Sequence, residues 1–195
     1  MCMHKPMSPH GDYDHLGEAN YLIENFKIKK IIFNSNEYNI NEKAIIKNIK
    51  IPYEKSNKSI NINNIKIYFL NSYKSHNENE SSIITYFNYQ NYKFLFMGDA
   101  NNNSERKLLN EYNLKKIDFL KVGHHGSNTS SSSSFINVIS PNYCIISVEK
   151  NNIYKHPHQE TINRLSSCKV LRTDEDGTIK IKISKNKVNI SNYCA

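Results

Sequence analysis

The chain has 195 residues, 38% of them hydrophobic and 23% charged, which is typical of one globular domain. With only 6 Gly and 5 Pro, collagen-like and fibrous classes are excluded. No apolar run approaches the roughly 20 residues that a bilayer-spanning helix requires, so no membrane segment is expected. The net charge of +8 would suit a polyanionic partner, but a composition rich in Asn, Ile and Lys explains it as well.

The N-terminal residues 1–6 lack the apolar segment of about 7 to 15 residues that marks a secretory signal peptide. A cytoplasmic location is therefore expected. The four cysteines Cys2, Cys144, Cys168 and Cys194 are far apart and contain no C-x-x-C pair, so neither a zinc ribbon nor a disulfide framework is indicated. We expect them to be reduced, with Cys144 in the core.

Hydrophobic periodicity predicts a mixed α/β domain with helices outside a sheet that has much antiparallel pairing. Helices are expected at 17–26, 41–48, 104–112, 134–139 and 158–165. Strands are expected at 30–34, 59–62, 65–70, 83–87, 94–97, 119–122, 143–148, 178–183 and 188–190. The Asn63-Asn64 pair and residues 89–91 predict hairpin turns, because Asn tolerates positive φ. No linker divides the chain, so residues 1–195 form a single predicted domain.

Six of the eight histidines lie in three short clusters on expected loops beside strands or helices. The first cluster contains His10, Asp12, Asp14 and His15. In an extended turn, alternate residues point the same way, so the first three converge while His15 reaches a neighbouring point. This pattern suits two metal ions side by side.

The other candidates follow expected strands. Asp99 comes directly after the strand at 94–97, where one carboxylate can bridge two cations. The second histidine cluster, His124-His125 with Ser127, follows the strand at 119–122, and the third, His156 and His158, precedes a helix. Each feature also has an interpretation without catalytic chemistry. An isolated Asp can cap a helix, paired His can be surface residues, and His156 and His158 can form a structural turn.

The ordered combination resembles a known family. The segments His10-x-Asp12-x-Asp14-His15, Gly98-Asp99, Gly123-His124-His125-Gly126-Ser127, His156-Pro157 and Arg172-Thr173-Asp174 are similar to those of metallo-β-lactamase-fold hydrolases of the ComEC competence-protein type. The resemblance runs from about residue 8 to 183. It implies an α/β (α+β) fold, an αββα sandwich of two sheets with helices outside.

The resemblance also implies a site with two divalent metal ions, Zn or Mn. His10 and Asp12 would bind one ion, Asp14 and His15 the other, and Asp99 would bridge them. One of His124 and His125 would complete the second site, with His124 slightly favoured. A hydroxide held by the ions would attack a phosphoryl or carbonyl centre of the substrate. The expected catalytic residues are Asp14 and Asp99, which bind the ions, and His156, which would donate to a phosphate oxygen or leaving group. Ser127, His156 and His158 are expected to contact substrate.

The chain reaches His10 after only nine residues, whereas family members have several strands first. We therefore expect a fold that lacks its first N-terminal strands, either as a fragment or as a degenerate version. The leading hypothesis is a phosphodiesterase or nuclease acting on DNA or another phosphodiester. The alternatives are a hydrolase of a lactone, thioester or β-lactam, and a catalytically inactive module that binds metal or nucleic acid.

Overall fold

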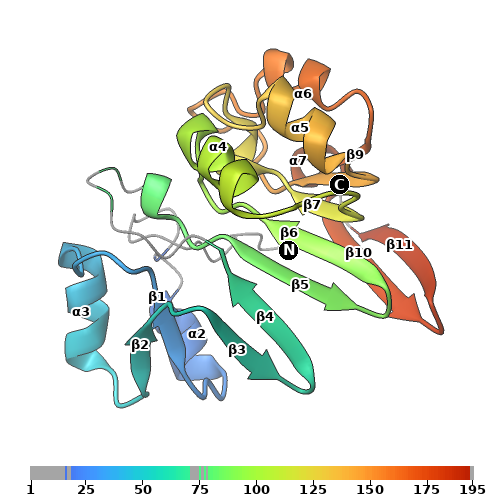
Figure 1. The fold of residues 1–195 in the computed structure, drawn as a ribbon. Coiled ribbons are helices and arrows are strands. Elements are labelled where there is room, and N and C mark those ends of the chain that lie inside the picture. The colour runs from blue at the N-terminus through green and yellow to red at the C-terminus, as the bar shows by residue number, and fades with distance from the viewer. Residues whose placement is uncertain (1–15, 17–18, 71–74, 76, 78, 194–195) are drawn as a thin grey trace.

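A computed structural model describes residues 16, 19–70, 75, 77 and 79–193 (Figure 1). Its centre is a seven-stranded sheet with strand order β3-β4-β5-β6-β7-β8-β9. The strands are β3 (Ser59–Ile62), β4 (Ile65–Phe69), β5 (Thr85–Tyr89), β6 (Tyr92–Phe96), β7 (Phe119–Lys121), β8 (Tyr143–Ile146) and β9 (Lys169–Arg172). Neighbours are antiparallel from β3 to β6 and parallel from β6 to β9. The predicted mixed class with extensive antiparallel pairing is confirmed.

Asparagine-containing turns close the hairpins. Asn63 and Asn64 have φ values of 47° and 68° between β3 and β4, and Gln90 and Asn91 have 46° and 68° between β5 and β6. Two central residues with positive φ match the right-handed twist of the flanking strands, which confirms both predicted turns. The same turn recurs at residues 185–186, which join β10 (Thr178–Ser184) to β11 (Lys187–Tyr193).

Three helices cover one face of the parallel half of the sheet (Figure 1). They are α4 (Asn102–Glu111), α5 (Ser133–Ile139) and α6 (Gln159–Arg164). The sheet residues Leu95, Leu120 and Cys144 are paired across β6, β7 and β8 and are 0% exposed, so they form the core beneath these helices. Helix α4 begins earlier than expected because Asn101, not Ser104, accepts the capping hydrogen bonds.

An aromatic ladder crosses the opposite face of the same sheet. The ring of Phe94 stacks on Phe87 at 4.7 Å and on Phe119 at 4.8 Å, and Phe119 stacks on Tyr143 at 5.0 Å between centroids. Because side chains alternate between the two faces of a strand, the ladder residues occupy the positions next to the aliphatic core residues. These cross-strand pairs fix the register of β5 to β8.

The N-terminal described part is a smaller unit beside β3 (Figure 1). Strands β1 (Ile31–Phe33) and β2 (Tyr53–Lys55) pair in parallel, with helices α2 (Ala19–Asn25) and α3 (Ile40–Asn48). The sequence predicts α2, β1 and α3 but misses β2, as well as β9 and the short helix α7 (Thr173–Asp176). None of the described helices is long and apolar enough to cross a membrane.

The structure overturns the expectation of reduced cysteines at two positions. Cys144 of β8 and Cys168, which precedes β9, form a disulfide with a Cα–Cα distance of 6.0 Å. The two residues lie on adjacent parallel strand segments, a proximity that spacing along the chain does not reveal. The buried placement of Cys144 is confirmed. Cys2 and Cys194 lie outside the described residues.

Loss of this disulfide is expected to lower the free energy of unfolding by about 3 kcal/mol, because it closes a loop with a sequence separation of 24 residues in the unfolded chain. The test is urea unfolding of Cys168→Ser beside the oxidised wild type. Wild type treated with dithiothreitol serves as the matched control and should unfold at the same lower urea concentration. Equal midpoints for all three samples would contradict the prediction.

Candidate metal centre

The candidate centre lies where β6, β7 and β8 end. Asp99 follows β6, His124 and His125 follow β7, and Ser147 follows β8. Because parallel strands have their carboxyl ends at one edge of a sheet, the three segments converge there. Asp99 is only 5% exposed, and its main-chain N–H donates to Ser82 Oγ at 3.0 Å. The N–H of His124 donates to the Gly98 carbonyl at 2.9 Å, which joins the two loops.

The two imidazoles face the two oxygens of one carboxylate. His124 Nε2 lies 4.0 Å from Asp99 Oδ2, and His125 Nε2 lies 3.7 Å from Asp99 Oδ1. These separations are longer than hydrogen bonds. They suit two donors on a shared cation, whose bonds to imidazole and carboxylate are roughly 2.0–2.2 Å long.

The tautomer of His125 supports the same interpretation. His125 Nδ1 lies 2.8 Å from the Ser147 carbonyl oxygen, which only accepts, so the ring proton is on Nδ1. In the neutral ring, Nε2 carries the lone pair and lies 3.7 Å from Asp99 Oδ1. Two acceptors that face each other repel, whereas a cation between them stabilises both. Asp99 and His125 can therefore supply two ligands of a divalent metal ion, and further ligands would have to come from other residues.

The backbone that carries the two histidines is strained. His124 and His125 both have left-handed conformations, with φ values of 46° and 50°. Such conformations cost on the order of 1–3 kcal/mol each for residues other than glycine and cluster at functional sites. The next residue, Gly126, has φ +83°, and a Cβ there would lie 2.5 Å from Pro157 Cβ. The loop before α6 therefore packs directly against the histidine turn.

The family model of the metallo-beta-lactamase superfamily matches residues 10–148. The chain belongs to that superfamily. Competence proteins are among the relatives of this metallo-β-lactamase-fold chain. The chain is 32% identical over 189 residues to ComE operon protein 3 of Bacillus subtilis. This match covers 92% of this chain and 24% of that relative. It is 40% identical over 98 residues to competence protein ComA of Neisseria gonorrhoeae, covering 48% of this chain and 14% of the relative.

These matches confirm the resemblance to ComEC-type proteins, of which the chain spans about a quarter or less of the length. The metallo-beta-lactamase fold protein YhfI from Bacillus subtilis is similar in structure, with a TM-score of 0.50 and 9% identity over 84% of this chain and 72% of that protein. The predicted metallo-β-lactamase fold is confirmed.

The other predicted ligands of this metallo-β-lactamase-fold chain, His10, Asp12, Asp14 and His15, lie outside the described residues. Within the part of the chain that the structure describes, no group of three or more His, Cys, Asp or Glu side chains is arranged to hold a metal ion. The structure thus brings together Asp99, His124 and His125, and the full ligand set stays a prediction.

The predicted substrate-contacting residues surround the same turn. The His156 ring lies 5.6 Å from His124 and 4.9 Å from His158 between centroids. Burial, with the neighbouring imidazoles, lowers the pKa of His156 to about 4, so its ring is neutral at pH 7. His158 Nδ1 accepts the Asn128 N–H at 3.0 Å. Ser127 is buried and its hydroxyl pairs with Thr129 Oγ1 at 3.1 Å, inside the loop.

Sequence reasoning misses Arg164, which holds the loop that follows the histidines. Its guanidinium donates to three main-chain carbonyls, those of Ser131 at 2.9 Å, Ser130 at 2.9 Å and Asn128 at 3.2 Å. It also donates to Thr161 Oγ1 at 3.0 Å. The signal in the sequence is the rarity of arginine in a lysine-rich chain, because only arginine offers a planar fork of five donors.

Glu105 of α4 holds the same loop from the other side and is 1% exposed. Its carboxylate accepts the N–H of Ser131, and it accepts the N–H and the hydroxyl of Ser132 at 2.9 and 2.7 Å. Burial raises the pKa of Glu105, while these hydrogen bonds and the charge of Arg164 oppose the rise. The loop is thus clamped between one buried acid and one arginine.

Two further residues near the site have no role assigned to them in the sequence prediction. Lys121 ends β7 near Asp99, and burial lowers its pKa to about 8 although the Asp99 charge opposes the shift. Thr173 of the Arg172-Thr173-Asp174 segment accepts the Val148 N–H and donates to the Val148 carbonyl, both at 2.8 Å. This segment therefore holds the end of β8 beside Ser147.

Proposed function

We propose that the chain is a metal-dependent hydrolase whose preferred bond is a phosphodiester, in nucleic acid or a smaller molecule. The observation that carries the proposal is the pair of imidazole nitrogens facing the two oxygens of buried Asp99 at 3.7 and 4.0 Å. The superfamily membership supports the proposal, because most members of this superfamily are hydrolases.

The ligands proposed for two divalent ions, Zn or Mn, are His10, Asp12, Asp14, His15, Asp99, and one or both of His124 and His125. When bound, the ions would lower the pKa of a water molecule and neutralise charge on the attacked group. Asp99 would hold them through its two oxygens, and the Ser147 carbonyl would keep the His125 ring in the ligating tautomer.

The remaining residues would act on the substrate. His156, whose ring lies 5.6 Å from that of His124, would donate a hydrogen bond to a substrate oxygen. His158 lies beside it. The buried hydroxyl of Ser127 is engaged within its own loop, so its proposed contact with substrate would require the loop to change its hydrogen bonds.

The cytoplasmic location predicted from the sequence stays a prediction. The Cys144–Cys168 disulfide argues against it, since disulfides persist mainly in oxidising compartments.

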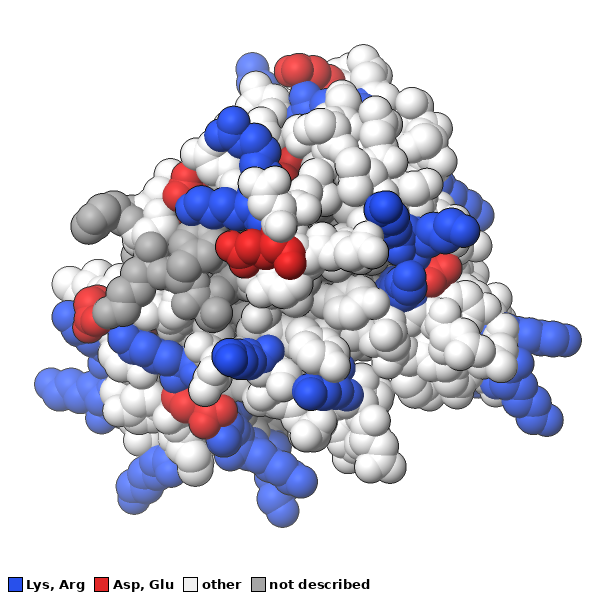
Figure 2. Space-filling model, viewed as in Figure 1, with Lys and Arg blue, Asp and Glu red and all other residues white. Residues whose placement is uncertain are grey.

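DNA as substrate is suggested by the competence proteins among the relatives and by the net charge of +8. Lysine and arginine side chains are spread widely over the face in Figure 2.

The proposal is tested by metal analysis and hydrolysis on the same samples. Purified protein is measured as isolated, after EDTA, and after reloading with Zn²⁺ or Mn²⁺, with bis(p-nitrophenyl) phosphate as substrate. We expect about two ions per chain, with hydrolysis lost after EDTA and restored by one of the metals. A folded protein that binds no metal would establish the inactive module instead. Metal-dependent cleavage of a thioester, lactone or β-lactam but not of the phosphodiester would replace the proposed substrate class.

A further inference from the structure

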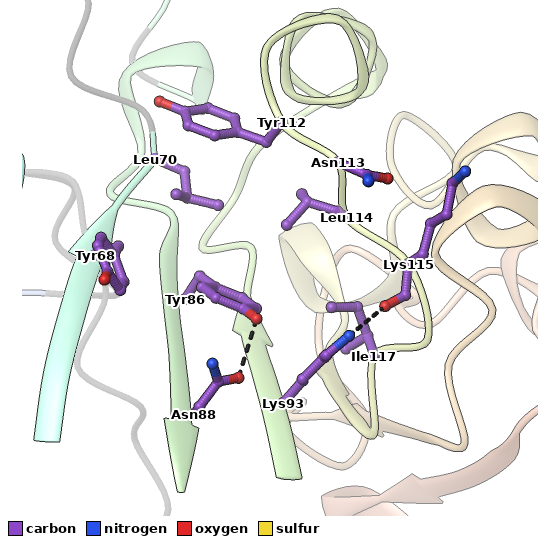
Figure 3. Close-up of a pocket in the computed structure, with 10 residues that line it drawn as sticks. All are labelled: Tyr68, Leu70, Tyr86, Asn88, Lys93, Tyr112, Asn113, Leu114, Lys115 and Ile117. Carbon is purple, nitrogen blue, oxygen red and sulfur yellow. Dashed lines mark hydrogen bonds between the residues drawn. The ribbon is translucent and has the colours of Figure 1, made fainter. Parts of the chain in front are cut away.

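A hollow lies on the helix-covered side of the sheet (Figure 3). Its volume is about 370 Å³, and strands β4 to β6 and the segment after α4 line it. Lys93 lies at the start of β6, whereas Asp99 follows the other end of that strand. At about 3.3 Å per residue, roughly 10 Å of strand separate Lys93 from Phe96, and Asp99 follows three residues later, so the hollow is distinct from the metal centre.

Three tyrosines supply aromatic surface in this hollow. Tyr68 and Tyr112 remain 38% and 36% exposed, and the Tyr86 ring lies 6.3 Å from that of Tyr68. Figure 3 shows Tyr112 on one side of the opening and Tyr86 on the other. Partly exposed rings of this kind offer flat faces on which a nucleobase can stack.

Cationic and amide groups lie next to the rings. Lys93 Nζ donates to the main-chain carbonyl of Lys115 at 3.0 Å, and Figure 3 shows the Lys115 amine directed away from Lys93. Asn88 Oδ1 accepts the Tyr86 hydroxyl at 3.0 Å, which leaves the Asn88 amide nitrogen as a donor. The described residues that line the hollow include no Asp or Glu. The lining therefore favours a ligand with a flat ring and a negative charge.

We propose that this hollow binds one nucleotide unit, with its base against Tyr68, Tyr86 and Tyr112 and its phosphate on Lys93. This proposal rests on the proposed function, because a nucleic-acid strand bound in the hollow would be held on the enzyme that cleaves its phosphodiester bonds. The binding itself requires no metal. A free nucleotide and a single strand share this chemistry, so the test separates them.

The probe is a fluorescein-labelled single-stranded thymidine 12-mer, and its binding to the whole chain is measured by fluorescence anisotropy in EDTA, which prevents metal-dependent cleavage. Tyr112→Ala is expected to weaken binding by roughly tenfold or more, whereas Tyr112→Phe, which keeps the ring, should bind as wild type does. Tyr193→Ala on β11 is the control, because it removes another exposed tyrosine ring (51% exposed, against 36% for Tyr112), and it should leave affinity unchanged.

The charge contribution is tested separately. Lys93→Gln is expected to reduce the slope of log affinity against log salt by about 0.7, the value for one phosphate contact on a single strand. Lys182→Gln on β10 is the control and should keep the slope. Unlabelled thymidine monophosphate that competes as well as the unlabelled 12-mer, per nucleotide, would identify a mononucleotide site, and weaker competition a strand site.

The outcomes separate the two proposals. Absence of binding by wild type, or equal effects of Tyr112→Ala and Tyr193→Ala, would overturn the nucleotide site and leave the metal-dependent hydrolase in place. Oligonucleotide binding that depends on Tyr112 and Lys93, in a protein that takes up no metal, would overturn the hydrolase and retain the site.

Discussion

Asp99→Asn is expected to lower the rate of phosphodiester hydrolysis by more than about 100-fold. Loss of a group that only supports a metal ligand costs up to about 100-fold, and loss of a ligand should cost more. The side chain is 5% exposed, and both its oxygens face imidazole nitrogens. An amide of the same shape keeps the fold but removes the negative charge and one acceptor. Bound metal should fall together with hydrolysis, as elemental analysis of the same preparation would show.

Glu149→Gln is the matched control, because it makes the same chemical change at an exposed carboxylate two residues after Ser147. This variant should retain the wild-type metal content and rate. The main-chain bond from Asp99 to Ser82 does not involve the carboxylate, so unfolding curves of Asp99→Asn should stay close to those of wild type. A folded Asp99→Asn protein with undiminished metal and turnover would remove Asp99 from the site.

Arg164→Ala is expected to lower the free energy of unfolding by about 4 to 5 kcal/mol. The substitution removes three hydrogen bonds to main-chain carbonyls and takes the nearby positive charge from buried Glu105. The loop after His124 and His125 should loosen, so hydrolysis should fall in the same variant. Urea unfolding measures the stability, and the rate is measured at a urea concentration where the variant remains folded.

Arg106→Ala provides the comparison, since Arg106 is exposed on α4 and its side chain bonds only the nearby Asn103 at 2.6 Å among the bonds described. Its loss should cost less than about 1 kcal/mol. Arg164→Lys should recover only part of the lost stability. Its ammonium group keeps the positive charge but cannot reach three carbonyls with the geometry of the guanidinium fork. If Arg164→Ala and Arg106→Ala had the same unfolding free energy, the clamp would not carry the stability assigned to it.

The parts of the fold that follow local rules can be predicted from the sequence. Asn63-Asn64 predicts its turn because Asn tolerates positive φ, and the apolar run before Gly98 predicts a buried strand. Strand β2 (Tyr53–Lys55) and strand β9 (Lys169–Arg172) are not predicted, because they are short, carry charged residues, and exist only through pairing with β1 and β8. The Cys144–Cys168 disulfide depends on the same long-range pairing.

For the candidate site, residue type and position after a strand predict Asp99 and His124-His125, because ligands need free side chains at the carboxyl end of a sheet. The groups that support them are not predictable in this way. Ser147 contributes a carbonyl, which every residue has, and Arg164 acts through carbonyls of other residues. Their roles depend on which segments meet in space.

The Arg164 and Glu105 clamp has a consequence for the run of five serines at 130–134. By composition this stretch is low-complexity sequence, of the kind commonly set aside as disordered. Two charged side chains hold it from outside by binding main-chain groups and, among the serine side chains, only Ser132, while the buried Ser130 hydroxyl donates to the Gly123 and Ser127 carbonyls. Repetitive sequence beside a candidate active centre can thus have a defined geometry, part of which depends on residues 26 positions before and 33 positions after Ser131.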